Sequence, residues 1–97
     1  MHARVTTVMV QPGKVEEATR IFRDIIMAQV KQLKGFKGAM LLTDPDTGKG
    51  ISVTVWDSKE DMIAVEASGK WAQMVGEFAA VLSGPPTREH YEVSVQV

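Results

Sequence analysis

Few side chains in this sequence of 97 residues could perform chemistry near neutral pH. It contains two histidines, and His2 lies at the N-terminal end, where chains are commonly mobile. His90 is therefore the one candidate for an internal general base, because imidazole has the unperturbed pKa closest to neutrality. No partner that would orient it is evident, so the alternative is a solvated histidine at the end of a strand.

Aromatic and hydroxyl side chains supply the candidates for ligand binding. Trp56 and Trp71 could stack on an aromatic ligand, and Tyr91 directly follows the candidate base. Each tryptophan could instead be structural, Trp56 in the core under a helix and Trp71 on a helix face. One of Thr6 and Thr7 is expected to face a pocket, where its hydroxyl could donate to a ligand oxygen or satisfy a neighbour.

Several classes of site and partner are excluded or disfavoured. The absence of cysteine excludes a disulfide scaffold, a thiolate zinc site and a cysteine nucleophile. Asp44, Asp46 and Thr47 lack the spacing of a cation-binding loop and are better explained by a turn, so we expect no metal site. A net charge of −1 with 11 scattered basic residues disfavours nucleic acid. No signal-like or membrane-spanning apolar run is evident, which predicts a soluble cytoplasmic protein without a membrane partner.

The spacing of apolar residues predicts the elements that position these side chains. Residues 51–56 alternate in the manner of a strand, and Ser58 with Asp61 resembles a capping box that begins a helix. Gly35 is expected to end the first helix. The predicted strands are 3–10, 36–43, 51–56 and 90–97, and the predicted helices are 14–33 and 58–82, the second with a break at Ser68-Gly69.

This order predicts a single α+β domain over residues 1–97. Two βαβ units give a ferredoxin-like βαββαβ fold, a four-stranded antiparallel sheet with both helices on one face and the first and third strands at its centre. Neither face of the sheet is polar enough for water, since Ile51, Val53 and Val55 alternate with positions that include Trp56. We therefore expect an obligate homodimer of facing sheets, which gains roughly 25 cal/mol per Å² of apolar area buried.

Two short motifs resemble a known family. They read Trp56-x-Ser58-x-Glu60-x-Met62-x-Ala64 and Ala67-Ser68-x-x-Trp71. Together with Gly35-Phe36 at the start of the second strand, they are similar to the signature of the antibiotic-biosynthesis monooxygenase (ABM) domain. The resemblance covers essentially the whole chain and implies a dimeric α/β barrel with a pocket between helices and sheet in each protomer.

The sequence departs from that family at positions that carry chemistry. Members often have a histidine nine residues after the tryptophan, where this chain has Val65. The haem-degrading branch uses an asparagine, a tryptophan and a histidine at positions that here are Thr6, Val65 and Val75. Valine cannot ligate iron, so haem degradation is disfavoured.

Two functions remain open. The resemblance implies a cofactor-independent monooxygenase for a small aromatic phenol or quinol, in which His90 would be the base and Thr6, Trp56, Trp71 and Tyr91 would bind substrate. Such an enzyme needs no cofactor, because the substrate's own anion reduces oxygen and the protein binds, orients and desolvates it. The alternative is a non-catalytic, stress-associated or small-molecule-binding homodimer, which the valines at reactive positions favour.

Overall fold

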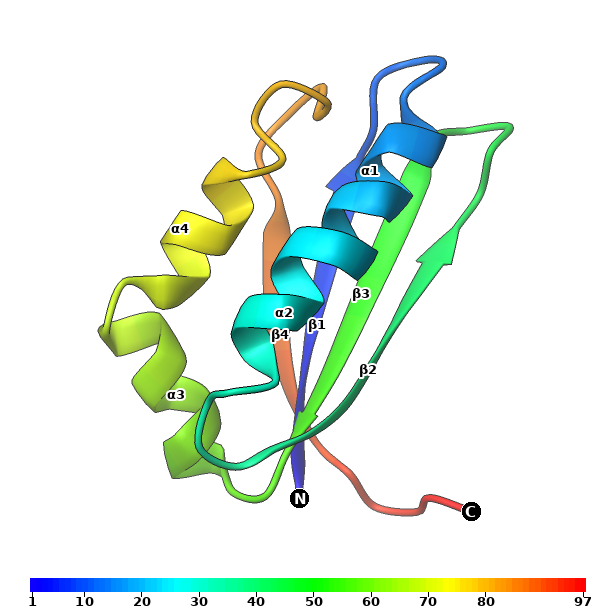
Figure 1. The fold of residues 1–97 in the computed structure, drawn as a ribbon. Helices are drawn as coiled ribbons and strands as arrows, with labels where there is room; N and C mark the ends of the chain where they lie inside the picture. The colour runs from blue at the N-terminus through cyan, green and yellow to red at the C-terminus, as the bar shows by residue number, and fades with distance from the viewer.

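The computed structural model of residues 1–97 contains one antiparallel sheet with the predicted order of elements (Figure 1). The strands are β1 (His2–Met9), β2 (Phe36–Thr43), β3 (Lys49–Trp56) and β4 (Thr87–Glu92). They lie in the order β2-β3-β1-β4, and every neighbouring pair is antiparallel. The first and third strands are thus the central pair, and the ferredoxin-like α+β fold is confirmed.

Two helical segments cover one face of this sheet (Figure 1). The first consists of α1 (Val15–Ile21), the π-helix η1 (Phe22–Ile26) and α2 (Met27–Val30), and the second of α3 (Lys59–Ala67) and α4 (Lys70–Gly76). The predicted start of α3 is confirmed, since the Asp61 backbone N–H donates to Ser58 Oγ at 3.1 Å. The predicted break is confirmed at Gly69, whose φ is 85°. None of the helices has the length and apolar character that a membrane crossing requires.

Alternation along the two central strands separates polar from apolar side chains. The cross-strand pairs Arg4–Thr54 and Thr6–Ser52 lie on the face that the helices cover, whereas the pair Val5–Val53 lies on the other face. That uncovered face is called the open face below. Its large apolar residues are Val5, Met9, Met40, Leu42, Ile51, Val53 and Val55.

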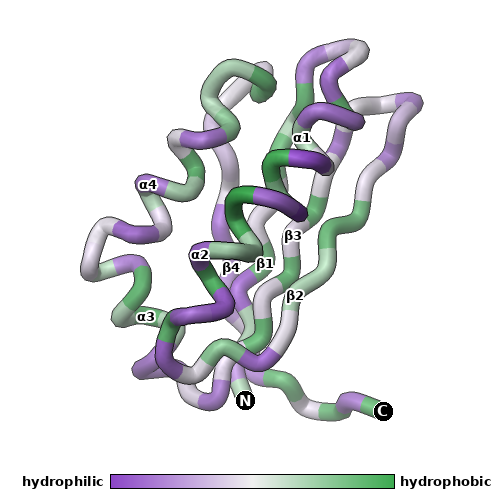
Figure 2. Tube along the Cα trace, in the orientation of Figure 1, coloured by the Kyte–Doolittle hydropathy of each residue, from purple (hydrophilic) through white to green (hydrophobic).

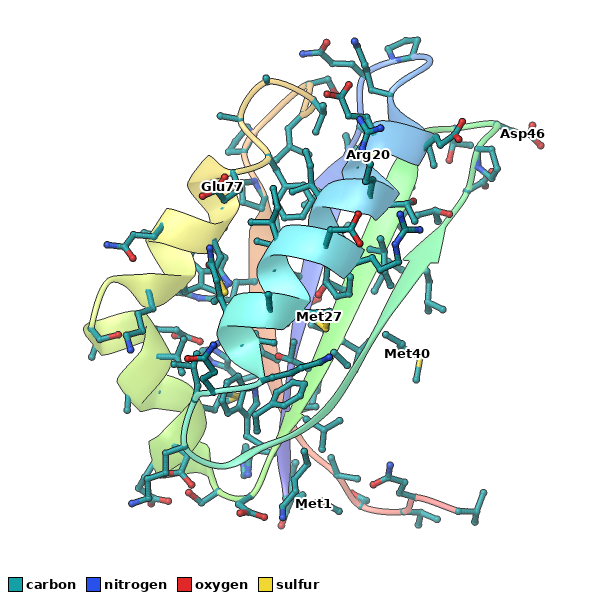
Figure 3. The ribbon with its side chains drawn as sticks, in the orientation of Figure 1. Met1, Arg20, Met27, Met40, Asp46 and Glu77 are labelled. Atoms are coloured by element: carbon teal, nitrogen blue, oxygen red, sulfur yellow. The ribbon has the colours of Figure 1, made fainter.

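The open face leaves these residues in contact with solvent. Met40 and Leu42 are 55% and 50% exposed, and Met40 projects from β2 away from the helices (Figure 3). Hydrophobic and hydrophilic residues also alternate along the tail that follows β4 (Figure 2). Only 16 of the 97 residues are buried, so the chain has a small core.

The core lies where β3 leaves the sheet and enters α3. Trp56 and Met62 have no exposed surface there, and they pack against Phe22, Ile26 and Val30 of the first helical segment. Phe36 at the start of β2 meets the Trp56 ring edge-on, with 5.6 Å between ring centroids, a favourable aromatic geometry. The junction between strand and helix therefore anchors both helical segments.

The last strand differs from its prediction. It spans Thr87–Glu92, whereas residues 90–97 were predicted. It begins earlier because Thr87 already pairs with Thr7 of β1. It ends earlier because Glu92 pairs with His2, where β1 begins, so residues 94–97 have no strand beside them.

Two further positions depart from the predicted alternation. In an unbroken strand Phe36 would share a face with Met40 and Leu42, but a β-bulge between Phe36 and Gly38 turns its ring toward the core. Ile25 continues the apolar spacing of the predicted helix 14–33, yet it is 39% exposed, and the observed helical segment ends at Val30. The π-helical turn at Phe22–Ile26 shifts the stripe around the helix axis.

Replacing Gly35 by alanine is predicted to destabilise the fold. Gly35 turns the chain from α2 into β2 with φ 83°, and a Cβ there would collide with the Asp61 carboxylate of α3. We expect Gly35→Ala to lower the free energy of unfolding by more than ~1 kcal/mol in urea denaturation. Gly76→Ala is the matched control, because a Cβ at this helical position meets no atom within 4 Å. It should raise stability by about 0.4–1 kcal/mol, and equal stability of the two variants would contradict the role assigned to Gly35.

Candidate functional site: a cavity between the helices and the sheet

A cavity of about 80 Å³ lies between the helical segments and the covered face of the sheet. This volume is several times what one buried water needs. The helical side of the cavity is apolar throughout, with Ala18, Phe22, Ile26, Val30, Trp71, Met74, Val75 and Phe78. The sheet side includes five polar residues, of which one is Thr43 of the edge strand β2. The other four, from the central strands, are called the polar floor below: Arg4, Thr6, Ser52 and Thr54. A flat apolar molecule with one polar edge fits such a lining.

The π-helix aligns one wall of the cavity. Ala18, Phe22, Ile26 and Val30 are spaced four residues apart, and all four are buried and line the cavity. In an unbroken α-helix each such step advances about 40° around the axis, so the four would spiral away from the sheet. The wider turn over Phe22–Ile26 reverses part of that drift and keeps the line facing inward. No helix signal in the sequence indicates this irregularity.

The polar floor is built from two cross-strand pairs. Arg4 lies opposite Thr54, and Thr6 lies opposite Ser52. The Trp56 indole N–H donates to Thr54 Oγ1 at 2.9 Å, so the Thr54 hydroxyl proton remains free to donate. The Thr6 and Ser52 hydroxyls have no hydrogen bond with the protein. Since every fully buried side-chain N or O atom has a partner, these hydroxyls reach open space.

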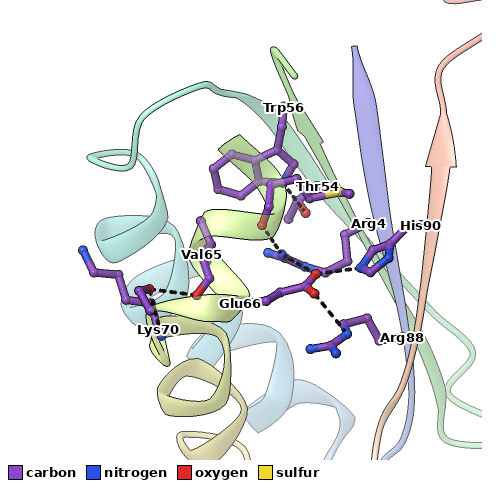
Figure 4. A network of polar contacts seen from close by, with 10 residues as sticks. Arg4, Thr54, Trp56, Val65, Glu66, Lys70, Arg88 and His90 are labelled. Carbon is purple, nitrogen blue, oxygen red and sulfur yellow. Dashed lines mark hydrogen bonds and ion pairs between the residues drawn. The ribbon is translucent and has the colours of Figure 1, made fainter. Parts of the chain in front are cut away.

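Arg4 is the one charged residue of the cavity lining, and it is only 2% exposed. Its Nη1 donates to Glu66 Oε2 at 3.2 Å and to the Met62 carbonyl at 3.4 Å (Figure 4). Its guanidinium carbon lies 5.5 Å from the centre of the Trp56 ring. Burial lowers the pKa of Arg4, and the hydrogen bond and charge of Glu66 offset part of that effect. The cation is thus held in place by a single carboxylate.

Glu66 joins this arginine to the edge strand. Its Oε2 also lies 2.7 Å from His90 Nε2, and its Oε1 lies 3.5 Å from Arg88 Nε (Figure 4). Because an ionised carboxylate only accepts, the Nε2–H of His90 donates to it. Arg88 in turn stacks over Trp71, with 4.5 Å from its guanidinium carbon to the ring centre. The network therefore connects the polar floor with a tryptophan of the opposite wall.

The structure brings some of the predicted site residues to the cavity and leaves others outside. Thr6 and Trp71 line it, as predicted for ligand-binding residues. Trp56 lies in the core behind the lining and reaches the cavity only through its bond to Thr54. Tyr91 lies opposite Ala3 on the open face, where a hydrogen bond with Glu89 raises its pKa. The catalytic and binding roles assigned to these residues remain predictions.

His90 was predicted as the catalytic base, and the structure places it on β4, outside the cavity lining. It does have an orienting carboxylate, Glu66, which the sequence did not reveal. Arg4, Ser52 and Thr54 were also not predicted as site residues. The alternation along the strands could have indicated these three residues. Arg4 shares a strand face with the predicted site residue Thr6, and Ser52 and Thr54 share one with the predicted site residue Trp56.

Fold and cavity together define a ferredoxin-like α+β domain with a largely apolar cavity under its helices. The chain belongs to the antibiotic biosynthesis monooxygenase family, whose model matches residues 1–77. The resemblance seen in the sequence is thereby confirmed. It supports a general monooxygenase-like role and leaves the substrate open.

Solved structures share the fold at low sequence identity. A monooxygenase from the gene ActVA-Orf6 of Streptomyces coelicolor, in complex with nanaomycin D, is 16% identical, with a TM-score of 0.81 over 99% of this chain and 89% of that one. A putative antibiotic biosynthesis monooxygenase from Bordetella bronchiseptica is 15% identical, with a TM-score of 0.80 over 94% of each chain. At these identities the likeness shows the fold alone.

Two relatives from Mycobacterium tuberculosis are uncharacterized proteins. Rv2558 is 27% identical over 96 residues, which is 98% of this chain and 39% of that protein. Rv2557 is 26% identical over 95 residues, which is 97% of this chain and 41% of that protein. The chain thus spans about two fifths of the length of these relatives.

Replacing Thr54 by valine is predicted to destabilise the core through Trp56. Valine has a similar shape but cannot accept the indole N–H, and a buried unsatisfied donor costs about 1–3 kcal/mol. Thr54→Ser keeps an acceptor at the same position and is the matched control. In urea denaturation we expect Thr54→Val to unfold at clearly lower urea than Thr54→Ser. Coincident transitions of the two variants would show that this hydrogen bond contributes nothing.

Proposed function

We propose that this protein is a cofactor-independent monooxygenase that acts on a small aromatic phenol or quinol. The observation that carries the proposal is the cavity, in which an apolar helical side faces a polar floor that can hold a ligand oxygen. Membership of the family supports the reaction class. The volume of about 80 Å³ favours a small ring system over a polycyclic phenol.

The reaction balances without a cofactor. A phenol and one molecule of oxygen give a quinone and water: one oxygen atom bonds to the ring carbon opposite the hydroxyl, and the other leaves as water with the two hydrogens lost. The ionised phenol is the electron donor, so the protein has to bind it, orient it and exclude water. The apolar helical side would supply the dry surroundings, and the hydroxyls of Thr6, Ser52 and Thr54 are the groups that could hold a ring oxygen.

A proton acceptor for the phenol is still required. His90 remains our candidate, and its bond to Glu66 gives it the carboxylate partner expected of an oriented histidine. Glu66 also contacts Arg4, which lines the cavity, so two residues separate the histidine from a bound ligand. A proton from the ligand would therefore have to reach His90 through an intervening group.

This separation favours a second candidate function, a non-catalytic small-molecule-binding domain. Apart from Arg4, no titratable side chain lines the cavity, and neither His90 nor Tyr91 does. An arginine holds its proton too tightly to act as a base near neutral pH. A protein that only binds an aromatic ligand needs no base, and Val75 in the lining suits that role.

For either function we propose a homodimer through the open face. Half-exposed Met40 and Leu42 flank the valines of β1 and β3 there, which is the composition of a protein interface and not of a solvated sheet. Each protomer alone buries few residues. Packing two open faces together would add a second apolar layer between the sheets.

The monooxygenase proposal predicts oxygen uptake with small phenols. In an oxygen electrode, a one-ring phenol with a free ring carbon opposite its hydroxyl should be oxidised faster with the protein than alone, with quinone absorbance rising in step, and a metal chelator should change neither. Val75→Phe fills the cavity and should abolish the increase. Ile63→Phe, at an exposed position of α3, should leave it intact. Uptake no faster than autoxidation across such substrates would favour the binding function.

The homodimer predicts a mass of two chains by sedimentation at micromolar concentration. Val53→Asp places a carboxylate in the middle of the open face and should give monomers of lower stability, since an unpaired buried charge is costly. Ile63→Asp introduces the same charge on a helix and should stay dimeric. A monomeric wild-type protein would exclude the dimer.

A further inference from the structure

The polar floor carries an unbalanced positive charge. The charged or titratable groups around the Arg4 guanidinium are Glu66 from α3 and, through Glu66, Arg88 and His90 from β4. The first helical segment, β3 and α4 contribute only apolar or hydroxyl side chains to the lining. Two arginines thus face one carboxylate, which leaves a formal excess of one positive charge with His90 neutral and a larger excess with it protonated.

Arg4 also has unused donors. Both of its protein hydrogen bonds leave from Nη1, whereas a guanidinium has five N–H groups spread over three nitrogens. Its Nε and Nη2 have no protein acceptor, and they reach open space because no fully buried side-chain N or O atom is unpaired. Arg4 lines the cavity, so these are the donors of Arg4 that remain available to a ligand bound there.

The hydroxyl of Thr54 adds a donor on the neighbouring strand. Its oxygen accepts from Trp56, which directs its proton elsewhere, and its residue lies opposite Arg4 in the register of β1 and β3. Two kinds of donor therefore converge on the polar floor, while no carboxylate lines the cavity. A cationic or purely apolar ligand would leave the buried donors unpaired, which costs free energy.

We infer that the cavity binds its ligand as an anion: a flat apolar body whose single anionic oxygen, a phenolate or an aryl carboxylate, lies against the free N–H groups of Arg4 and the Thr54 hydroxyl. The phenolate form of the inference rests on the proposed function, in which Arg4 would ionise the substrate by binding its anion preferentially. The proton of the phenol then passes to water, or to His90 through an intervening group, so no strong proton acceptor is needed inside the cavity. Arg4 is a binding residue in this scheme and exchanges no proton.

The experiment compares three probes with the same ring and different heads: 4-nitrophenol, 4-nitrobenzoate and 4-nitrotoluene. Binding is measured anaerobically at a pH about one unit below the pKa of free 4-nitrophenol. We expect the yellow phenolate band to grow on addition of protein, and the apparent pKa of the bound phenol to fall by about one unit or more, since hydrogen bonds to a charged group favour the ionised form. The neutral 4-nitrotoluene should bind about tenfold more weakly than the tighter anion, or weaker still.

The relative affinity of the two anions identifies the source of the oxygen. Tighter binding of the phenolate identifies the ligand class as phenols, and tighter binding of the carboxylate identifies it as aryl acids. The inference is overturned if bound 4-nitrophenol remains neutral, if 4-nitrotoluene binds as tightly as the anions, or if none of the three binds.

Variants test the role of charge in opposite directions. Arg4→Gln should remove the preference for the anion, whereas Glu66→Gln should raise anion affinity, because it frees Arg4 from its counter-charge. A loss of affinity in folded Glu66→Gln would overturn the inference, since that is what a merely structural role predicts. Arg23→Gln, an exposed arginine paired with Asp24, is the matched control and should change nothing. Circular dichroism checks folding, and the wild-type probe series decides the question if Arg4→Gln does not fold.

Failure of this inference and failure of the proposed function give different results. Phenolate binding in the anaerobic experiment together with no oxygen uptake in air leaves the anion site intact and removes the monooxygenase. Oxygen uptake with a phenol that binds in its neutral form supports the monooxygenase and removes the anion site.

Discussion

The buried guanidinium of Arg4 is the constraint on which the rest of the structure depends. A cation that is 2% exposed must have its charge balanced locally, and Glu66 of α3 provides the carboxylate. The same carboxylate contacts Arg88 and His90 on β4, so the edge strand and α3 meet at one side chain. One charged cluster therefore links a central strand, an edge strand and a helix around the polar end of the cavity.

The opposite side of the cavity depends on backbone geometry. The π-helical turn over Phe22–Ile26 keeps the buried side chains of the first helical segment in line. The left-handed Gly69 redirects the chain between α3 and α4, so that α4 lays Trp71 and Met74 over the sheet. Both departures from regular helix thus shape the apolar wall. An unbroken helix in either segment would turn some of these side chains away and change the shape of the cavity.

The sequence predicts the architecture well and the site poorly, for a physical reason. Alternation, caps and glycines are local signals, and they correctly indicate the βαββαβ order, the Ser58 cap and the break at Gly69. The contact between Arg4 and Glu66 joins residues 62 positions apart, and no local pattern reports it. The shift of β4 and the inward turn of Phe36 likewise depend on partners across the sheet.

The central strands also reverse the usual assignment of their faces. On β3, Ser52 and Thr54 lie under the helices, while Val53 and Val55 lie on the open face. If the stability of a single chain were the only requirement, the valines of the sheet would be expected under the helices. Here the polar face lies under the helices because it lines a cavity. Its hydroxyls and arginine would be costly to bury without a hydrogen-bond partner, and the cavity leaves them accessible. The apolar residues are then left on the open face, so a single alternation accounts both for the polar floor of the cavity and for the exposed apolar surface on the other side of the sheet.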